Sequence, residues 1–96
     1  MHRYKCRILE IHDEFLKVEI DLGFDIKRVE QVTLQGVRFI DVKASEFTKY
    51  FFKDEDEIIV ETRKKSADSY YEGRFFSSGV CLNDELIRQE LAEFRP

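Results

Sequence analysis

The sequence predicts a mainly β domain with helices, of the α+β class, in the order βββαββα. Three observations lead to this order. Residues 15–22 alternate between apolar and polar side chains, which is the period of a half-buried strand. Residues 44–52 place aromatic rings at the i, i+3 and i+4 spacing of a helix. Residues 83–94 begin with a favourable capping residue and carry an apolar stripe, which predicts the closing helix.

The whole chain, residues 1–96, is expected to form one domain. Hydrophobic residues make up 43% of the 96 positions, and a chain of this length buries about 60% of its unfolded surface. No apolar run approaches the roughly 20 residues of a membrane span and no secretory leader is seen, so we expect a cytoplasmic protein without a membrane partner. Cys6 and Cys81 lack zinc or disulfide spacing, so no metal or other cofactor is predicted.

The first two strands follow from apolar periodicity. Residues 4–11 are expected to form the first strand, with a bulge or bend near Ile8, where the apolar positions change phase. Residues 15–22 form the second strand after a polar turn, and Gly23 then permits the chain to reverse. The inward face of the second strand is expected to carry four apolar side chains, Leu16, Val18, Ile20 and Leu22.

Residues 29–35 form the third predicted strand, with Val32 and Leu34 directed inward. Gly36 interrupts this strand, and residues 37–41 are expected to continue it after a kink.

The second half of the chain supplies the remaining elements. After the helix over residues 44–52, an acidic run at 54–57 leads to a short apolar strand at 58–60, which a basic loop follows. Residues 69–76 form the fifth strand. Asn83 is expected to cap the last helix, because asparagine accepts from free backbone N–H groups at helix starts. The apolar stripe of that helix is expected to be Leu86, Ile87, Leu91 and Phe94.

This order of elements, in fewer than 100 residues, is typical of a five-stranded Greek-key barrel of the OB type. The first helix is expected to fill one end of the barrel.

Three segments resemble the phage-type branch of the staphylococcal nuclease (thermonuclease) family, in the same order and on the expected elements. They are residues 15–36, with the turn Asp21-Leu22-Gly23-Phe24, residues 44–49 and residues 79–92. The resemblance implies the same barrel and a bacterial or phage-like source. Family members hydrolyse phosphodiesters of DNA and RNA with calcium, using carboxylates to hold the metal, arginines to neutralise the phosphate and a glutamate as base.

Read without gaps, the resemblance implies that the catalytic positions of this family are degenerate here. Glu14 keeps one carboxylate of the metal-binding turn, while Thr33 replaces an arginine that grips the phosphate. Arg38 stands where the family has a metal ligand, and Asp41 stands where it has the general base. Tyr70 occupies the position of the second arginine. These replacements predict a protein without catalytic residues or a metal site.

A gapped alternative treats residues 37–41 as the arginine-and-metal segment of the family. Arg38 then binds phosphate, Asp41 holds the metal, Arg74 is the second arginine and Glu46 takes the role of base. This alternative implies a calcium-dependent phosphodiesterase with a rearranged site.

The net charge of −4 disfavours a nucleic-acid binder, because such proteins gather basic residues to displace counterions. The candidate basic patch is Arg63, Lys64 and Lys65. The next strand carries rings on which bases could stack, Tyr70, Tyr71, Phe75 and Phe76. A weak, non-hydrolytic binder of single-stranded nucleic acid is therefore a further alternative. The function that we expect is a non-catalytic OB-fold module that binds a macromolecule, most readily a protein.

Overall fold

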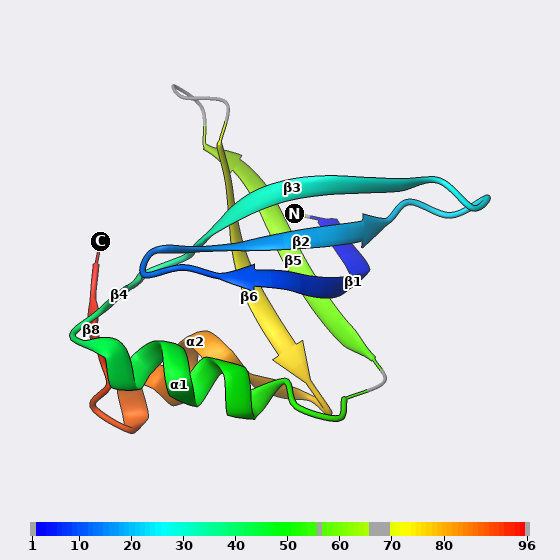
Figure 1. Ribbon diagram of the computed structural model, residues 1–96. Coiled ribbons are helices and arrows are strands. Elements are labelled where there is room, and N and C mark those ends of the chain that lie inside the picture. Colours follow the sequence, from blue (N-terminus) through cyan, green and yellow to red (C-terminus); the bar gives the residue numbers. More distant parts are fainter. Residues whose placement is uncertain (1, 56, 66–69, 96) are drawn as a thin grey trace.

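The computed structural model describes residues 2–55, 57–65 and 70–95, and for Lys64, Lys65 and Tyr70 it describes the backbone. Ten elements follow one another along the chain (Figure 1). They are β1 (His2–Ile11), β2 (Phe15–Asp21), β3 (Lys27–Leu34), β4 (Val37–Phe39), α1 (Val42–Phe51), β5 (Ile58–Lys65), β6 (Tyr70–Ser77), β7 (Val80–Cys81), α2 (Leu82–Arg88) and β8 (Ala92–Phe94).

Strands β1, β2, β3, β6 and β5 form a closed barrel, which confirms the predicted five-stranded OB-type architecture. The pairs β1–β2, β2–β3, β1–β5 and β5–β6 are antiparallel. A parallel ladder between residues 32–34 of β3 and 71–73 of β6 closes the barrel. Gly73 makes this closure possible, because a Cβ atom there would lie 2.6 Å from Cγ1 of Val32.

The predicted bulge near Ile8 is confirmed. Along the β1–β2 ladder the register shifts between Ile8, which pairs with Val18, and Glu10, which pairs with Lys17. The extra residue bends β1, so that its first half pairs with β5 and its second half with β2.

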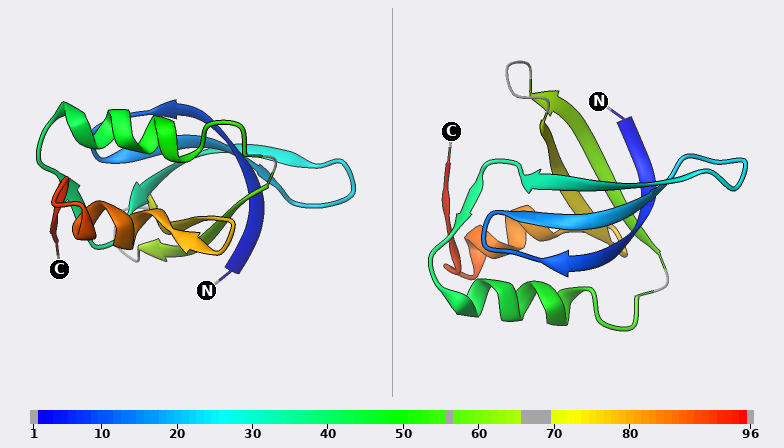
Figure 2. Two further views of the ribbon diagram at one scale, coloured as in Figure 1. Left: turned by 90° about the horizontal axis from the view of Figure 1, so that it is seen from below. Right: turned by 45° about the horizontal axis from the view of Figure 1, so that its top comes forward.

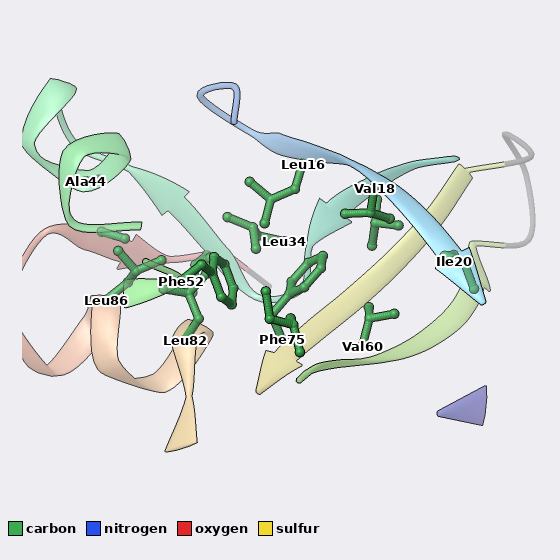
Figure 3. Close-up of a cluster of buried hydrophobic side chains, with 14 residues drawn as sticks. Leu16, Val18, Ile20, Leu34, Ala44, Phe52, Val60, Phe75, Leu82 and Leu86 are labelled. Carbon is green, nitrogen blue, oxygen red and sulfur yellow. The ribbon is translucent and has the colours of Figure 1, made fainter. Parts of the chain in front are cut away.

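The core fills the barrel and continues beneath the two helices, which lie at the same end of it (Figures 2 and 3). The inward faces of β2 and β3 are buried as predicted at Leu16, Val18, Ile20, Val32 and Leu34. Thr48 of α1 is also buried, and its hydroxyl donates to the carbonyl oxygen of Ala44 at 2.8 Å. Leu22, predicted to be inward, follows the last residue of β2 and is 42% exposed.

The predicted extent of the fourth strand was wrong, and so was the loop predicted after it. The strand predicted at residues 58–60 continues as far as Lys65, because β5 pairs with β6 from Ile58↔Ser77 to Lys65↔Tyr70. The basic segment 63–65 is therefore part of a strand and not a loop. Ser69, the predicted start of the fifth strand, lies outside the described residues.

The end of the chain also differs from the prediction. The second helix ends at Arg88, and Ala92–Phe94 forms β8, which pairs with β4. Phe94 is therefore not part of a helical stripe and is 73% exposed. Residues 37–41 do not extend β3, because β4 makes a separate sheet with β8.

Asn83 does not cap the helix. Cys81 is the capping residue, without a side-chain hydrogen bond, and Asn83 is buried in the second helical position. Its Oδ1 accepts from the backbone N–H of Phe75 at 3.1 Å, and its Nδ2 donates to the carbonyl oxygens of Gln35 at 2.9 Å and Gly73 at 3.0 Å. Asn83 therefore joins α2 to β6 and to the end of β3.

Candidate functional site

A groove of about 790 Å³ gathers three of the sequence-predicted site residues, Glu14, Arg38 and Asp41. Glu14 comes from the turn between β1 and β2, Arg38 from β4, and Asp41 from the junction of β4 and α1. Glu93 of β8 also lines this groove. Sequence reasoning missed Glu93, because residues 83–94 were assigned to a single helix. We call this hollow the Arg38 groove.

Four charged side chains of the Arg38 groove make contacts within the chain, and Asp13 also lines the groove. Arg38 forms an ion pair with Glu93, its register partner across β4 and β8. Asp41 caps α1, since its Oδ1 accepts from the backbone N–H of Lys43 at 2.7 Å. Glu14 is exposed, and its Oε1 lies 3.8 Å from Nη1 of Arg95.

The other predicted catalytic residues lie outside this groove. Thr33 lies near the end of β3 in the barrel wall, where it pairs with Phe15 of β2 and Glu72 of β6. Arg74 on β6 forms an ion pair with Asp84 of α2 at 2.8 Å.

The four residues of the gapped reading do not lie together in one groove. Glu46 is exposed on α1 and does not line the Arg38 groove. The side chain of Tyr70 lies outside the described part of the chain. Within residues 2–55, 57–65 and 70–95, no group of three or more His, Cys, Asp or Glu side chains is arranged to hold a metal ion.

Arg63 is the one residue of the basic segment on β5 whose side chain the structure describes, and a carboxylate neutralises it. Arg63 forms an ion pair with Glu72 across the β5–β6 ladder, at 3.3 Å. Together with Tyr4 and Tyr71 it lines a pocket of about 440 Å³ at the mouth of the barrel. The side chains of Lys64 and Lys65 lie outside the described part of the chain.

Cationic side chains elsewhere on the strands are also paired with carboxylates. The described ion pairs that join strand residues include Arg3–Glu61, Arg7–Glu19, Lys17–Glu10, Lys27–Glu19 and Arg28–Glu30. Alternating charge of this kind differs from the continuous basic surface that binds a phosphate backbone.

The aromatic residues of β6 divide between the core and the surface. Phe75 is fully buried in the core, while Tyr71 is half-buried at the mouth of the barrel. Phe76 is half-buried on the outer face, where the guanidinium carbons of Arg3 and Arg74 lie 5.3 and 5.8 Å from its ring centroid.

The end of the β2–β3 hairpin is a second candidate site, which the sequence indicated only as a turn. The hairpin extends beyond the barrel wall (Figure 1). Its tip exposes three apolar side chains, and we call Leu22, Phe24 and Ile26 the hairpin tip. Phe24 is 98% exposed. The apolar alternation of β2 continuing past Gly23 was the signal in the sequence for this surface.

The turn holds Phe24 in a conformation that costs free energy. The backbone N–H of Ile26 donates to the carbonyl oxygen of Gly23 at 2.9 Å, which closes a four-residue turn. Its two central residues, Phe24 and Asp25, have φ of 53° and 61°. Positive φ at both positions is what a type I′ turn requires, and glycine or asparagine suits it better than phenylalanine does.

Comparison with models of known protein families and with curated proteins finds no match to this chain. None of the helices in the described residues is long and apolar enough to cross a membrane.

Proposed function

We propose that this chain is a non-catalytic OB-fold module, similar in architecture to the staphylococcal nuclease family, that binds another protein through its hairpin tip. The observation that carries the proposal is the fully exposed Phe24 at the end of a projecting hairpin, held at positive φ. We place its action in the cytosol, in a bacterial or phage-like source.

The Arg38 groove supports the non-catalytic part of the proposal. Calcium takes six to eight oxygen ligands. In the Arg38 groove Glu93 is paired with Arg38 and Asp41 accepts from a backbone N–H, so few carboxylate oxygens are free for a metal ion. Asp41 is already used as a helix cap, so it is a poor candidate for a base that must take a proton from water.

The hairpin tip supports a protein partner on energetic grounds. A residue other than glycine at positive φ lowers the stability of the fold by of order 1–3 kcal/mol. An exposed phenylalanine makes no core contacts that offset this loss. Burying that ring in an interface contributes about 1.5–3 kcal/mol. Aromatic anchors that enter a partner's pocket commonly dominate the affinity of protein interfaces.

A photo-crosslinking experiment tests the proposal. The crosslinker p-benzoylphenylalanine replaces Phe24 in one variant and Glu46, an exposed residue of α1, in a matched control. In an extract of the source organism, we expect position 24 to label a defined protein that position 46 does not label. Excess unmodified protein should compete with this labelling, whereas excess Phe24→Ser should not.

Three outcomes would overturn the proposal. The protein-binding part fails if Phe24→Ser competes as well as the unmodified protein, or if position 46 labels the same partner. The non-catalytic part fails if calcium produces hydrolysis of single-stranded DNA above background and Glu14→Ala abolishes that hydrolysis.

Single-stranded nucleic-acid binding is a second candidate, favoured by the pocket that Arg63 shares with Tyr4 and Tyr71. Fluorescence anisotropy of labelled single-stranded DNA at two salt concentrations tests it. Binding at this pocket should weaken steeply with salt and disappear when Arg63, Lys64 and Lys65 are all changed to glutamate. Tight binding that survives the triple change would place the contact surface elsewhere.

A further inference from the structure

A groove of about 560 Å³ lies between the end of α1 and the turn from β6 to β7. It shares no residue with the hairpin tip or with the Arg38 groove. One wall consists of Phe47, Tyr50 and Phe51 of α1, and Val80 of β7 contributes to the lining. Tyr50 is 75% exposed, so much of this apolar surface faces solvent. We call this hollow the aromatic groove.

A chain of ring contacts anchors the wall of the aromatic groove to the core. The ring centroids of Phe47 and Phe51 lie 6.1 Å apart, and those of Phe51 and Phe52 lie 5.2 Å apart in an edge arrangement. Phe52 in turn lies 6.1 Å from Phe75, which is fully buried in the barrel. The part of the wall formed by Phe47 and Phe51 is therefore preformed, and a ligand does not have to order it.

A buried hydroxyl without a partner lines the same groove. Ser77 at the end of β6 is 5% exposed, and its Oγ makes no hydrogen bond within the described part of the chain. Buried hydroxyl groups are normally hydrogen-bonded, because they lose their bonds to water on folding. A backbone N–H or carbonyl group of a ligand would supply the missing bond once the Ser77 side chain turns toward the groove.

Carboxylates predominate at the rim. Asp54, Glu55 and Glu85 line the groove, against one ammonium group from Lys53. Glu85 is paired with Arg88 at 2.7 Å, and Glu55 accepts from the Ser78 hydroxyl at 3.4 Å. The rim therefore favours a cationic ligand and repels the phosphates of nucleic acids and anionic lipids.

We propose that the aromatic groove binds a short peptide segment of a second protein, with one apolar anchor side chain flanked by lysine or arginine. The anchor packs on Tyr50 and Phe51, the flanking cations face Asp54 and Glu55, and a backbone group of the segment bonds to Ser77. This site is additional to the hairpin tip, and either site can bind without the other.

Selection from a phage library of random peptides tests this site. The folded chain is the target, and a double variant, Tyr50→Ser with Val80→Ser, removes peptides that bind elsewhere. Both residues are exposed, so the double variant should retain the fold, which a melting curve checks. We expect the enriched peptides to carry an aromatic or aliphatic residue between basic residues.

One enriched peptide is then synthesised with a fluorescent label for affinity measurements. Its Kd should rise at least tenfold with the double variant and also with Asp54→Asn and Glu55→Gln combined. Ser77→Ala should weaken binding roughly 2- to 12-fold, the range expected for one hydrogen bond, without lowering the melting temperature. Phe24→Ser should leave the Kd unchanged, which separates this site from the hairpin tip.

Three results would overturn this assignment. They are failure to enrich any peptide, enrichment of acidic peptides, and equal affinity for the unmodified chain and the double variant.

Discussion

Arg38 on β4 and Glu93 on β8 are register partners, and their side chains form an ion pair beside Glu14. The pair joins the last strand to the groove in which the sequence placed a degenerate nuclease site. A carboxylate from the end of the chain thus neutralises the cation that replaces a metal ligand in the ungapped reading.

Millimolar calcium should leave the melting curve of the unmodified protein within about a degree of its original position. A ligand at a hundredfold excess over its Kd stabilises the native state by about 2.7 kcal/mol, which for a domain of this size is about 10 °C or more. Arg38→Asp should lower the melting temperature without metal, because Glu93 loses its partner, and should create a calcium response. A clear rise with calcium in the unmodified protein would show that a metal site survives.

Replacing Asn83 with alanine should destabilise the protein by about 2–4 kcal/mol in urea unfolding. The change removes three hydrogen bonds and leaves the N–H of Phe75 and the carbonyl of Gly73 buried without that partner. Gln89→Ala, an exposed change at the end of the same helix, should stay within about 0.5 kcal/mol. A loss below about 1 kcal/mol for Asn83→Ala would contradict a bridging role.

Gly73→Ala should cost about 1–3 kcal/mol, because the added methyl would lie 2.6 Å from Cγ1 of Val32 and 3.0 Å from Cγ2 of Val60. Adding Val32→Ala gives the methyl room, so the double variant should lose less stability than the two single changes together. Additive losses would mean that the close contact with β3 is not what requires glycine here.

Phe24→Asn should raise the free energy of unfolding by about 0.5–1 kcal/mol, because asparagine tolerates positive φ better than phenylalanine does. The same variant should fail to compete with labelling of the partner at the hairpin tip. Chemical denaturation and the crosslinking competition measure the two effects on one variant. Unchanged stability would argue against strain at this turn.

Burial raises the pKa of the Cys6 thiol to about 12. The unfolded chain therefore releases this proton at lower pH than the native state does, and the resulting contribution to stability is lost as pH rises between about 9 and 12. Cys6→Ala should reduce the fall in unfolding free energy over that range, measured against the unmodified protein. Equal pH slopes for the two proteins would show that Cys6 titrates normally.

Local periodicity was enough to predict the barrel strands and the bulge. The alternation of Leu16, Val18 and Ile20 predicts a strand with one buried face, whatever the rest of the chain does. The change of phase near Ile8 predicts the extra residue in β1. The end of the chain could not be predicted in this way. Leu91 and Phe94 fit a helical spacing, but β8 forms because Ala92–Phe94 finds β4, a partner far away in the sequence.

The candidate sites were predictable to different degrees. Glu14, Arg38 and Asp41 of the ungapped reading line one groove, although Arg38 lies on β4, whose pairing with β8 was not expected. Glu93 was not predicted as a residue of this groove, because its strand, β8, was not predicted. The aromatic groove was not predicted either, because the helical spacing of Phe47 and Phe51 indicates burial and does not reveal that they line a groove with residues of β6 and β7.

The parallel ladder between residues 32–34 and 71–73 has a consequence for biogenesis. The β1–β2–β3 meander contains only local pairings and can assemble while the rest of the chain is being translated. Until β6 leaves the ribosome, however, the outer edge of β3 carries free backbone donors and acceptors. Neighbouring nascent chains on a polysome carry the same edge, so the speed of translation through α1 and β5 competes with misassembly between them.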